Sequence, residues 1–292
     1  MLRYESIEGL IKEAEATGRL LSDLTLEQQA AQIERPAEEI YEGMRCSLQV
    51  MREAVAEGID PDLRSASGLT GGTAWRMQQQ VEAGKTLCGP MLGGALVRAL
   101  AVSELNAAMG RIVAAPTAGS CGIIPAAVLS LSEERGLPER ETVMSLFTAS
   151  AVGMVIAQNA SISGAQGGCQ AECGSASAMA AAALVELAGG TPRMIGHAVA
   201  IALKNILGLV CDPVAGLVEI PCIKRNAGGV ANALVAAELA LAGIPSAIPP
   251  DEVILAMKRV GDLMPAALRE TAEGGLAQTP TGCALCRQVF GE

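Results

Sequence analysis

From residue 92 onward, the chain alternates alanine-rich apolar segments with short polar interruptions. These segments are long enough for helices of several turns, whereas period-two alternation and persistent β-branched runs are scarce. The pattern therefore predicts an all-α fold. The expected helices cover residues 92–110, 122–134, 139–158, 167–189, 192–208, 226–242 and 250–261.

The core of such a fold must be built from small and aliphatic side chains. Half of the residues are apolar, but only 2% are aromatic. The 33 glycines allow helices to approach one another closely. We therefore expect a compact bundle of Ala/Gly-rich helices over residues 61–292, preceded by an N-terminal helical arm over residues 1–60.

Helix-end signals divide the N-terminal arm into three helices. Ser6 can cap a first helix that Gly18 ends, and Thr25 opens a capping-box pattern for a second. Pro36 suits the first turn of a third helix that runs to about Glu57. The arm carries no chemical motif, so we expect it to serve packing or partner binding.

The charge balance limits the partners of the chain. A formal net charge of -10 argues against nucleic acid and against an anionic membrane surface. Residues 142–171 carry no charge, but their apolar part covers only residues 143–157, short of the roughly 20 that a membrane span needs. A buried helix is expected there. The N-terminus has no apolar stretch of signal-peptide length, and a cytoplasmic location is expected.

The cysteines are the richest source of chemistry in the chain. There are nine, and in a reducing compartment each is a small buried hydrophobe, a metal ligand or a reactive thiol. Cys169, Cys211 and Cys222 stand beside glycine- or proline-rich breaks, too far apart in sequence for one zinc knuckle. Cys283 and Cys286 form a C-x-x-C near the tail. Thiolates suit zinc or iron–sulfur clusters, and the spacing alone leaves both open.

Three polar interruptions, at residues 116–122, 159–168 and 211–222, lie between apolar segments and could converge on one pocket. Hydroxyls and amides at helix ends can simply satisfy free backbone groups. The clustering of all three interruptions favours a site instead. The candidate substrate-binding residues are Thr117, Ser120, Asn159, Ser161 and Ser163.

Other common chemistries are poorly supported. The only histidine is His197, which rules out a histidine-rich zinc or di-iron site within this chain. Pyridoxal catalysis would need a lysine in a phosphate-binding cup, and no such cup is evident near Lys204.

Eight motifs in one order resemble those of the iron–sulfur-dependent L-serine dehydratases (L-serine ammonia-lyases), above all the separate alpha subunit of the two-subunit bacterial form. The resemblance covers essentially the whole chain. The motifs lie at residues 67–72 (SGLTGG), 115–122 (APTAGSCG), 159–165 (NASISGA), 168–172 (GCQAE), 211–216 (CDPVAG), 221–222 (PC), 269–271 (RET) and 274–277 (GGLA).

The resemblance implies conversion of L-serine to pyruvate and ammonia with a [4Fe–4S] cluster and without pyridoxal phosphate. The family's ligand cysteines fall on Cys169, Cys211 and Cys222, and a tail cysteine that caps the cluster in some relatives falls on Cys283, with Cys286 one turn later. Single-chain relatives carry a further domain with histidines, so a beta subunit is the implied partner and a possible source of the general base. An oligomer is expected.

Two alternatives stay open at this point. A related lyase acting on L-cysteine would share the cluster and release sulfide. A non-enzymatic cysteine module, either zinc-stabilised or redox-sensing, would use the same thiols without turnover.

Overall fold

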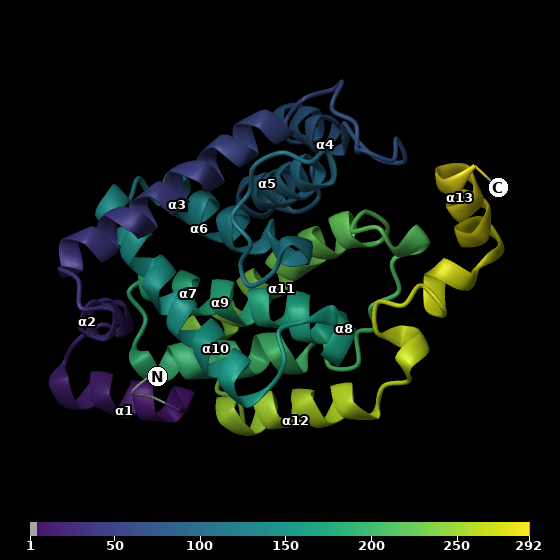
Figure 1. Cartoon of the computed structure of the whole chain (residues 1–292). Helices are drawn as coiled ribbons and strands as arrows, with labels where there is room; N and C mark the ends of the chain where they lie inside the picture. Colours follow the sequence, from purple (N-terminus) through teal and green to yellow (C-terminus); the bar gives the residue numbers. More distant parts are fainter. Residues whose placement is uncertain (1–4, 292) are drawn as a thin grey trace.

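The computed structural model describes residues 5–291, which form helices joined by short loops and contain no β-strand (Figure 1). This confirms the all-α prediction. The helices are α1 (Ile7–Thr17), α2 (Leu21–Ile33), α3 (Ala37–Gly58), α4 (Thr73–Glu82), α5 (Gly89–Ala107), α6 (Ile123–Arg135), α7 (Glu139–Asn159), α8 (Gly164–Gly167), α9 (Ser175–Leu187), α10 (Pro192–Lys204), α11 (Cys222–Leu241), α12 (Pro250–Leu263) and α13 (Pro280–Phe290).

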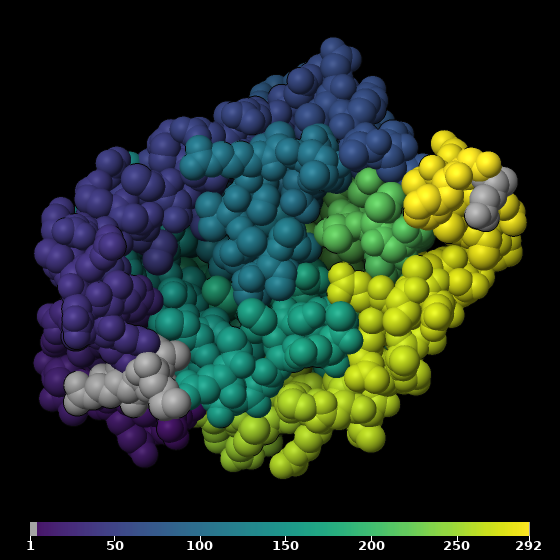
Figure 2. All heavy atoms as spheres, in the orientation of Figure 1, coloured from purple at the N-terminus to yellow at the C-terminus, as the bar shows by residue number. Residues whose placement is uncertain are grey.

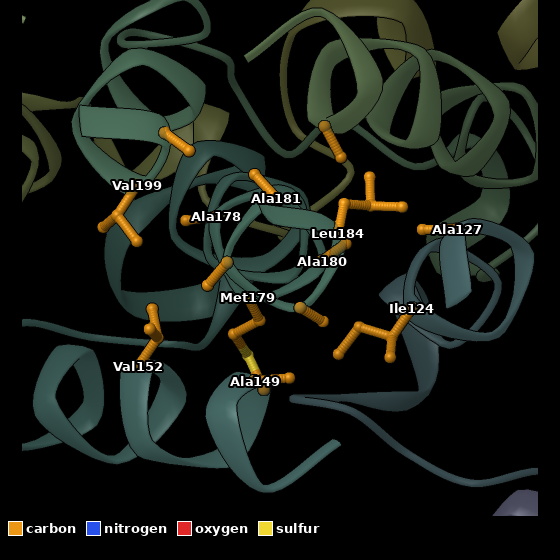
Figure 3. Close-up of a cluster of buried hydrophobic side chains, with 14 of the residues drawn as sticks. Ile124, Ala127, Ala149, Val152, Ala178, Met179, Ala180, Ala181, Leu184 and Val199 are labelled. Atoms are coloured by element: carbon orange, nitrogen blue, oxygen red, sulfur yellow. The ribbon is translucent and has the colours of Figure 1, made fainter. Parts of the chain in front are cut away.

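Helix α9 is the centre of the fold. It contacts α6, α7, α10 and α11, and all of its residues but Glu186 are buried. Figure 3 shows Ile124 of α6, Val152 of α7 and Val199 of α10 around the alanines of α9. Alanine side chains let the neighbouring backbones come close, so dispersion contacts replace the aromatic packing that the composition lacks.

The predicted start and end of α1 are confirmed, but the predicted start of α2 at Thr25 was wrong. The Ser6 hydroxyl accepts a hydrogen bond from Gly9 N at 3.0 Å, and Gly18 ends α1 in the left-handed conformation at φ 66°. Helix α2 begins before Thr25, whose hydroxyl donates to Leu21 O at 2.7 Å inside the helix. A threonine within a helix can bond back one turn, so it does not need to be a cap.

Carboxylates from distant helices bond the free N–H groups where three helices begin. Asp251 accepts from Ile7 N at the start of α1, Glu186 from Ser22 N in α2, and Glu104 from the first N–H groups of α4. A negative charge at a helix N-terminus also complements the helix dipole. These contacts tie the N-terminal helices to the central bundle, and Ile7 and Leu21 share its buried core. The domain boundary at residue 60 stays a prediction.

Helix α7 is the one helix among residues 5–291 that is long and apolar enough to cross a membrane. Within its most apolar window, 72% of the residues are buried inside the fold. The expectation of a buried helix over this segment agrees with that burial.

The chain after α12 runs along one side of the molecule to α13 (Figure 2). Along this path Cys211 N donates to Leu268 O at 2.9 Å and Glu270 N donates to Cys211 O at 2.8 Å. Helix α13 contacts the turn Val214–Gly216 that follows Cys211. The tail is therefore packed against one of the three candidate cysteine segments.

Candidate functional site

The three candidate ligand cysteines come from three different segments of the bundle. Cys169 precedes the π-helical turn Gln170–Gly174, Cys211 lies in the bridge to the tail, and Cys222 is the first residue of α11. Their exposed fractions are 2%, 3% and 8%, and none forms a disulfide. All three cysteines are therefore buried free thiols that could act as ligands.

Electrostatic effects connect the three thiols. Burial, followed by the charge of Cys169, raises the pKa of Cys211 and raises that of Cys222 to about 12. The pKa of Cys169 is lowered, chiefly by a hydrogen bond with Cys173, whose sulfur lies 3.3 Å away, and also by the charge of Arg225. Cys169 is therefore the thiol of the three that forms a thiolate most readily.

The loop before α6 carries two of the candidate hydroxyls. Thr117 Oγ1 and Ser120 Oγ are 3.2 Å apart, and Thr117 Oγ1 also donates a short hydrogen bond to Glu172 Oε1. Asn226 holds this loop in place, because its Nδ2 donates to Gly119 O at 2.7 Å. Asn226 lies one turn after Cys222 on α11, so the hydroxyl loop and a candidate cysteine share one anchor.

The second polar loop, between α7 and α8, has a more structural character. Asn159 Nδ2 donates to Glu5 O at 2.8 Å and to Val155 O at 2.9 Å. Ser161 Oγ donates to Gln166 Oε1 at 2.9 Å and accepts from Ser163 N at 3.0 Å. These bonds shape the loop, which forms one wall of a cavity of about 440 Å³.

Two glycines let side chains pack closely against the backbone of the loops. A Cβ atom placed on Gly164 would lie 2.9 Å from Cys211 Sγ, 3.2 Å from Glu270 Oε2 and 3.4 Å from Glu172 Oε2. A Cβ atom on Gly119 would lie 2.7 Å from Glu172 Oε1. A candidate ligand thiol and two carboxylates therefore come together beside Gly164, where a side chain would not fit without a shift.

Glu172 and Glu270 are the residues that sequence reasoning missed. Burial raises the pKa of Glu172; the Thr117 hydrogen bond opposes this effect, and the charge of Glu270 adds to it. Both glutamates stand inside motifs that carry the family resemblance, at residues 168–172 and 269–271. An acidic residue three positions after a candidate cysteine was the available signal.

A buried ion pair ties the cysteine segments together. Arg225 Nη2 donates to Asp212 Oδ1 and Arg225 Nη1 to Val210 O, each at 2.8 Å. The second oxygen of Asp212 accepts from Leu276 N at 2.7 Å. Asp212 follows Cys211 directly, so one carboxylate joins α11, the Cys211 segment and the tail.

The glycine-rich loop at residues 67–72 is anchored beside the same region. Thr70 Oγ1 donates to Glu219 Oε2 at 2.8 Å, and Glu219 lies in the segment between Cys211 and Cys222. The loop therefore connects α3 and α4 to the cysteine segments.

The tail cysteines lie on α13 and are partly exposed. The Cys283 thiol donates to Ala277 O at 3.7 Å. Among residues 5–291, no group of three or more His, Cys, Asp or Glu side chains is arranged to hold a single metal ion.

The chain is similar in sequence to known proteins over nearly its whole length. The model of the family "Serine dehydratase alpha chain" matches residues 15–277. The chain is 51% identical to the probable L-serine dehydratase, alpha chain, of Bacillus subtilis (strain 168), over 99% of this chain and 96% of that protein. It is 45% identical to the L-serine dehydratase, alpha chain, of Peptoniphilus asaccharolyticus, over 94% of each.

A relative longer than this chain also matches nearly all of it. The chain is 40% identical to L-serine dehydratase 2 of Escherichia coli (strain K12), over 96% of this chain and 62% of that protein. The family match, the near-complete coverage and the all-helical fold agree with one another. The chain belongs to the serine dehydratase alpha chain family.

Proposed function

We propose that this chain is the alpha chain of an L-serine dehydratase, which converts L-serine to pyruvate and ammonia, and that Cys169, Cys211 and Cys222 hold a [4Fe–4S] cluster. The observation that carries the proposal is the set of three buried thiols that influence one another's pKa, with the loop of Thr117 and Ser120 anchored through Asn226, one turn after Cys222. The names of the relatives supply the substrate.

The donor set fits such a cluster better than a single ion. Thiolates on one zinc ion each lie about 2.3 Å from it, so they crowd together. A [4Fe–4S] cluster takes one thiolate on each of its ligated irons, so the cysteines stand further apart. Among residues 5–291, the three thiols influence one another's pKa but are not arranged around a point where a single ion could bind, which agrees with the second case.

When bound, a cluster with three cysteine ligands supplies an iron that can act as a Lewis acid on the hydroxyl that leaves. The chain itself supplies orientation. Ser120 Oγ lies 3.2 Å from Thr117 Oγ1 and can donate to the substrate carboxylate, whereas the Thr117 proton goes to Glu172, so Thr117 would contact the substrate as an acceptor. Buried hydrogen-bonding groups held at fixed positions reduce the entropy cost of the reactive geometry.

The roles proposed for the second loop are more limited. Asn159 is engaged with backbone carbonyls, so its contribution would be to hold the loop. Ser161 lines the cavity and remains a candidate substrate contact, and Ser163 remains a candidate through its place in the same loop.

The test is anaerobic co-expression with a beta subunit, followed by measurement of iron, acid-labile sulfide and pyruvate formation. Replacing Cys169, Cys211 or Cys222 with serine should lower cluster content and abolish turnover. Cys46→Ser is the matched control, because Cys46 is an exposed thiol on α3. Full iron content and turnover in all three serine variants would disprove the ligand assignment.

Substrate preference is tested on the same preparation. We expect pyruvate formation from L-serine to exceed that from L-cysteine, in line with the names of the relatives. Faster sulfide release from L-cysteine would favour the desulfidase alternative, and a colourless zinc-loaded protein would favour a non-enzymatic module.

We further propose that the enzyme is cytoplasmic and works as an oligomer with a beta subunit, and that Cys283 is the tail ligand. The packing of α13 against the turn after Cys211 supports a tail role. Cys283→Ser should change oxygen sensitivity or the lag before turnover. Unchanged behaviour in both measurements would remove Cys283 from the site.

A further inference from the structure

We infer that Asn226 is a positioning residue for the proposed reaction, because it holds the Ser120 hydroxyl at a fixed place relative to Cys222. The inference rests on the proposed function, in which Ser120 donates to the substrate carboxylate and Cys222 is a cluster ligand. Asn226 stands outside the motifs that carry the family resemblance, so its role follows from its contacts in the fold.

The side-chain amide of Asn226 is buried and makes three hydrogen bonds. The residue is 1% exposed. Its Nδ2 donates to Gly119 O at 2.7 Å and to Cys222 O at 3.0 Å, and its Oδ1 accepts from Gly122 N at 2.9 Å. One amide therefore joins the first turn of α11 to the loop on both sides of Ser120.

An amide suits these three partners because it offers two N–H donors and one carbonyl acceptor. A carboxylate could accept from Gly122 N, but it would face the carbonyl oxygens of Gly119 and Cys222 without a proton to donate. An aliphatic side chain would leave buried backbone groups without partners, which is costly. The contacts therefore favour asparagine at this position.

Ser120 lies where these bonds control its position. It follows Gly119 directly, it is 0% exposed, and its Oγ lies 3.2 Å from Thr117 Oγ1. A Cβ atom on Gly122 would lie 2.5 Å from Ala99 O, so the backbone after Ser120 is packed tightly against α5. The loop is thus packed on α5 and bonded to α11, and loss of the bonds to α11 would let the Ser120 hydroxyl move.

A double-mutant cycle on the cluster-loaded enzyme with its beta subunit tests the link to Ser120. Asn226→Ser shortens the side chain and removes the bonds to the loop, while the new hydroxyl can still bond Cys222 O one turn back, as serines in helices do. Alone, it should lower kcat/KM for L-serine about tenfold, the value of one lost hydrogen bond. In a Ser120→Ala background the same change should lower kcat/KM by less than about twofold, because the hydroxyl that Asn226 positions is gone.

A second measurement needs no turnover. Amide hydrogen exchange of the cluster-free chain reports on the loop directly, since Gly122 N donates to Asn226. In Asn226→Ser, residues 118–122 should exchange about tenfold faster, while residues 176–187 of α9 should keep their rate.

Asn232→Ser is the matched control. Asn232 lies on the same helix, but its Nδ2 donates to Ala202 O of α10 at 2.8 Å instead of to the loop. This variant should leave both the exchange of residues 118–122 and kcat/KM within about twofold of the wild type. Iron and sulfide content should match the wild type in every variant.

Three results would overturn the inference. Equal losses from Asn226→Ser with and without the Ser120 hydroxyl would mean that Asn226 does not act through Ser120. Unchanged exchange at residues 118–122 would mean that it does not hold the loop, and loss of the cluster or of helical circular dichroism would indicate a general structural role. Failure of the proposed function is a separate result, in which the wild-type enzyme forms no pyruvate while the difference in exchange persists.

Discussion

Replacing Arg225 with methionine should destabilise the fold strongly. The Arg225 and Asp212 side chains are 17% and 4% exposed, so their ion pair is largely buried. Methionine retains the apolar stem but leaves the Asp212 carboxylate with one hydrogen-bond donor from residues 5–291, the Leu276 N–H. Removing one partner of a buried pair costs about 3–5 kcal/mol, because the remaining charge stays buried without compensation. A domain stability of about 5–15 kcal/mol makes this a large fraction of the total.

The measurement is urea denaturation of the cluster-free chain, which removes stabilisation by a bound ligand. Far-UV circular dichroism and the fluorescence of Trp75, the single tryptophan, provide two independent probes. Arg111→Met is the matched control, because Arg111 is exposed, and it should change the free energy of unfolding by less than about 0.5 kcal/mol.

A double-mutant cycle tests the reason for the effect. Combining Arg225→Met with Asp212→Asn should cost less than the sum of the two single changes, because the second change removes the unpaired charge. A loss below about 1 kcal/mol for Arg225→Met, or strict additivity in the cycle, would refute the reasoning.

Further changes test the packing around the site. Glu104→Gln should cost about 1–3 kcal/mol in urea denaturation, because the carboxylate accepts from Thr73 N and Ala74 N at the start of α4; a neutral result would show that this cap is dispensable. Phe147→Ala should cost about 3–5 kcal/mol, since the ring is 0% exposed, and a smaller loss would mean that the core collapses into the space. Burial raises the pKa of Glu186 in the folded state, so the ionised carboxylate destabilises the fold. This destabilisation is lost as the pH falls through the raised pKa toward the ordinary pKa of a glutamate. Glu186→Gln should therefore be most favourable relative to wild type at about pH 8 and less so at about pH 5, and an equal difference at both pH values would contradict the assignment.

The long apolar segments were predictable because helix formation depends on neighbours in sequence. The expected helices at residues 139–158 and 250–261 correspond to α7 and α12 within two residues at each end. Local signals failed where the backbone changes direction. The expected helix at residues 167–189 is interrupted at Gly168, which adopts φ 75°, and by a π-helical turn before α9.

Three helices were absent from the expectation. The four-residue helix α8 lies within the polar interruption at residues 159–168. Helix α4 has no side-chain cap of its own, and the carboxylate that caps it comes from Glu104 on α5. Helix α13 is short and half exposed, and it lies against the turn after Cys211. The cap of α4 comes from a distant residue, which periodicity within a window cannot reveal. Helix α13 instead has local signals that the expectation missed, since Thr279 accepts from Gly282 N, Pro280 opens the helix and Gly291 ends it at φ 74°.

The sequence by itself determined the residue types of the site. These are cysteines beside glycine- and proline-rich breaks, and hydroxyl side chains between apolar helices. Only the tertiary structure decided which of them meet. It placed Glu172 against Thr117 and close to Gly164, and it engaged Asn159 with backbone carbonyls. The physical reason is that the sequence gives the chemistry of each side chain separately. Burial, charge coupling and close packing against a glycine arise only where separate segments of the chain meet.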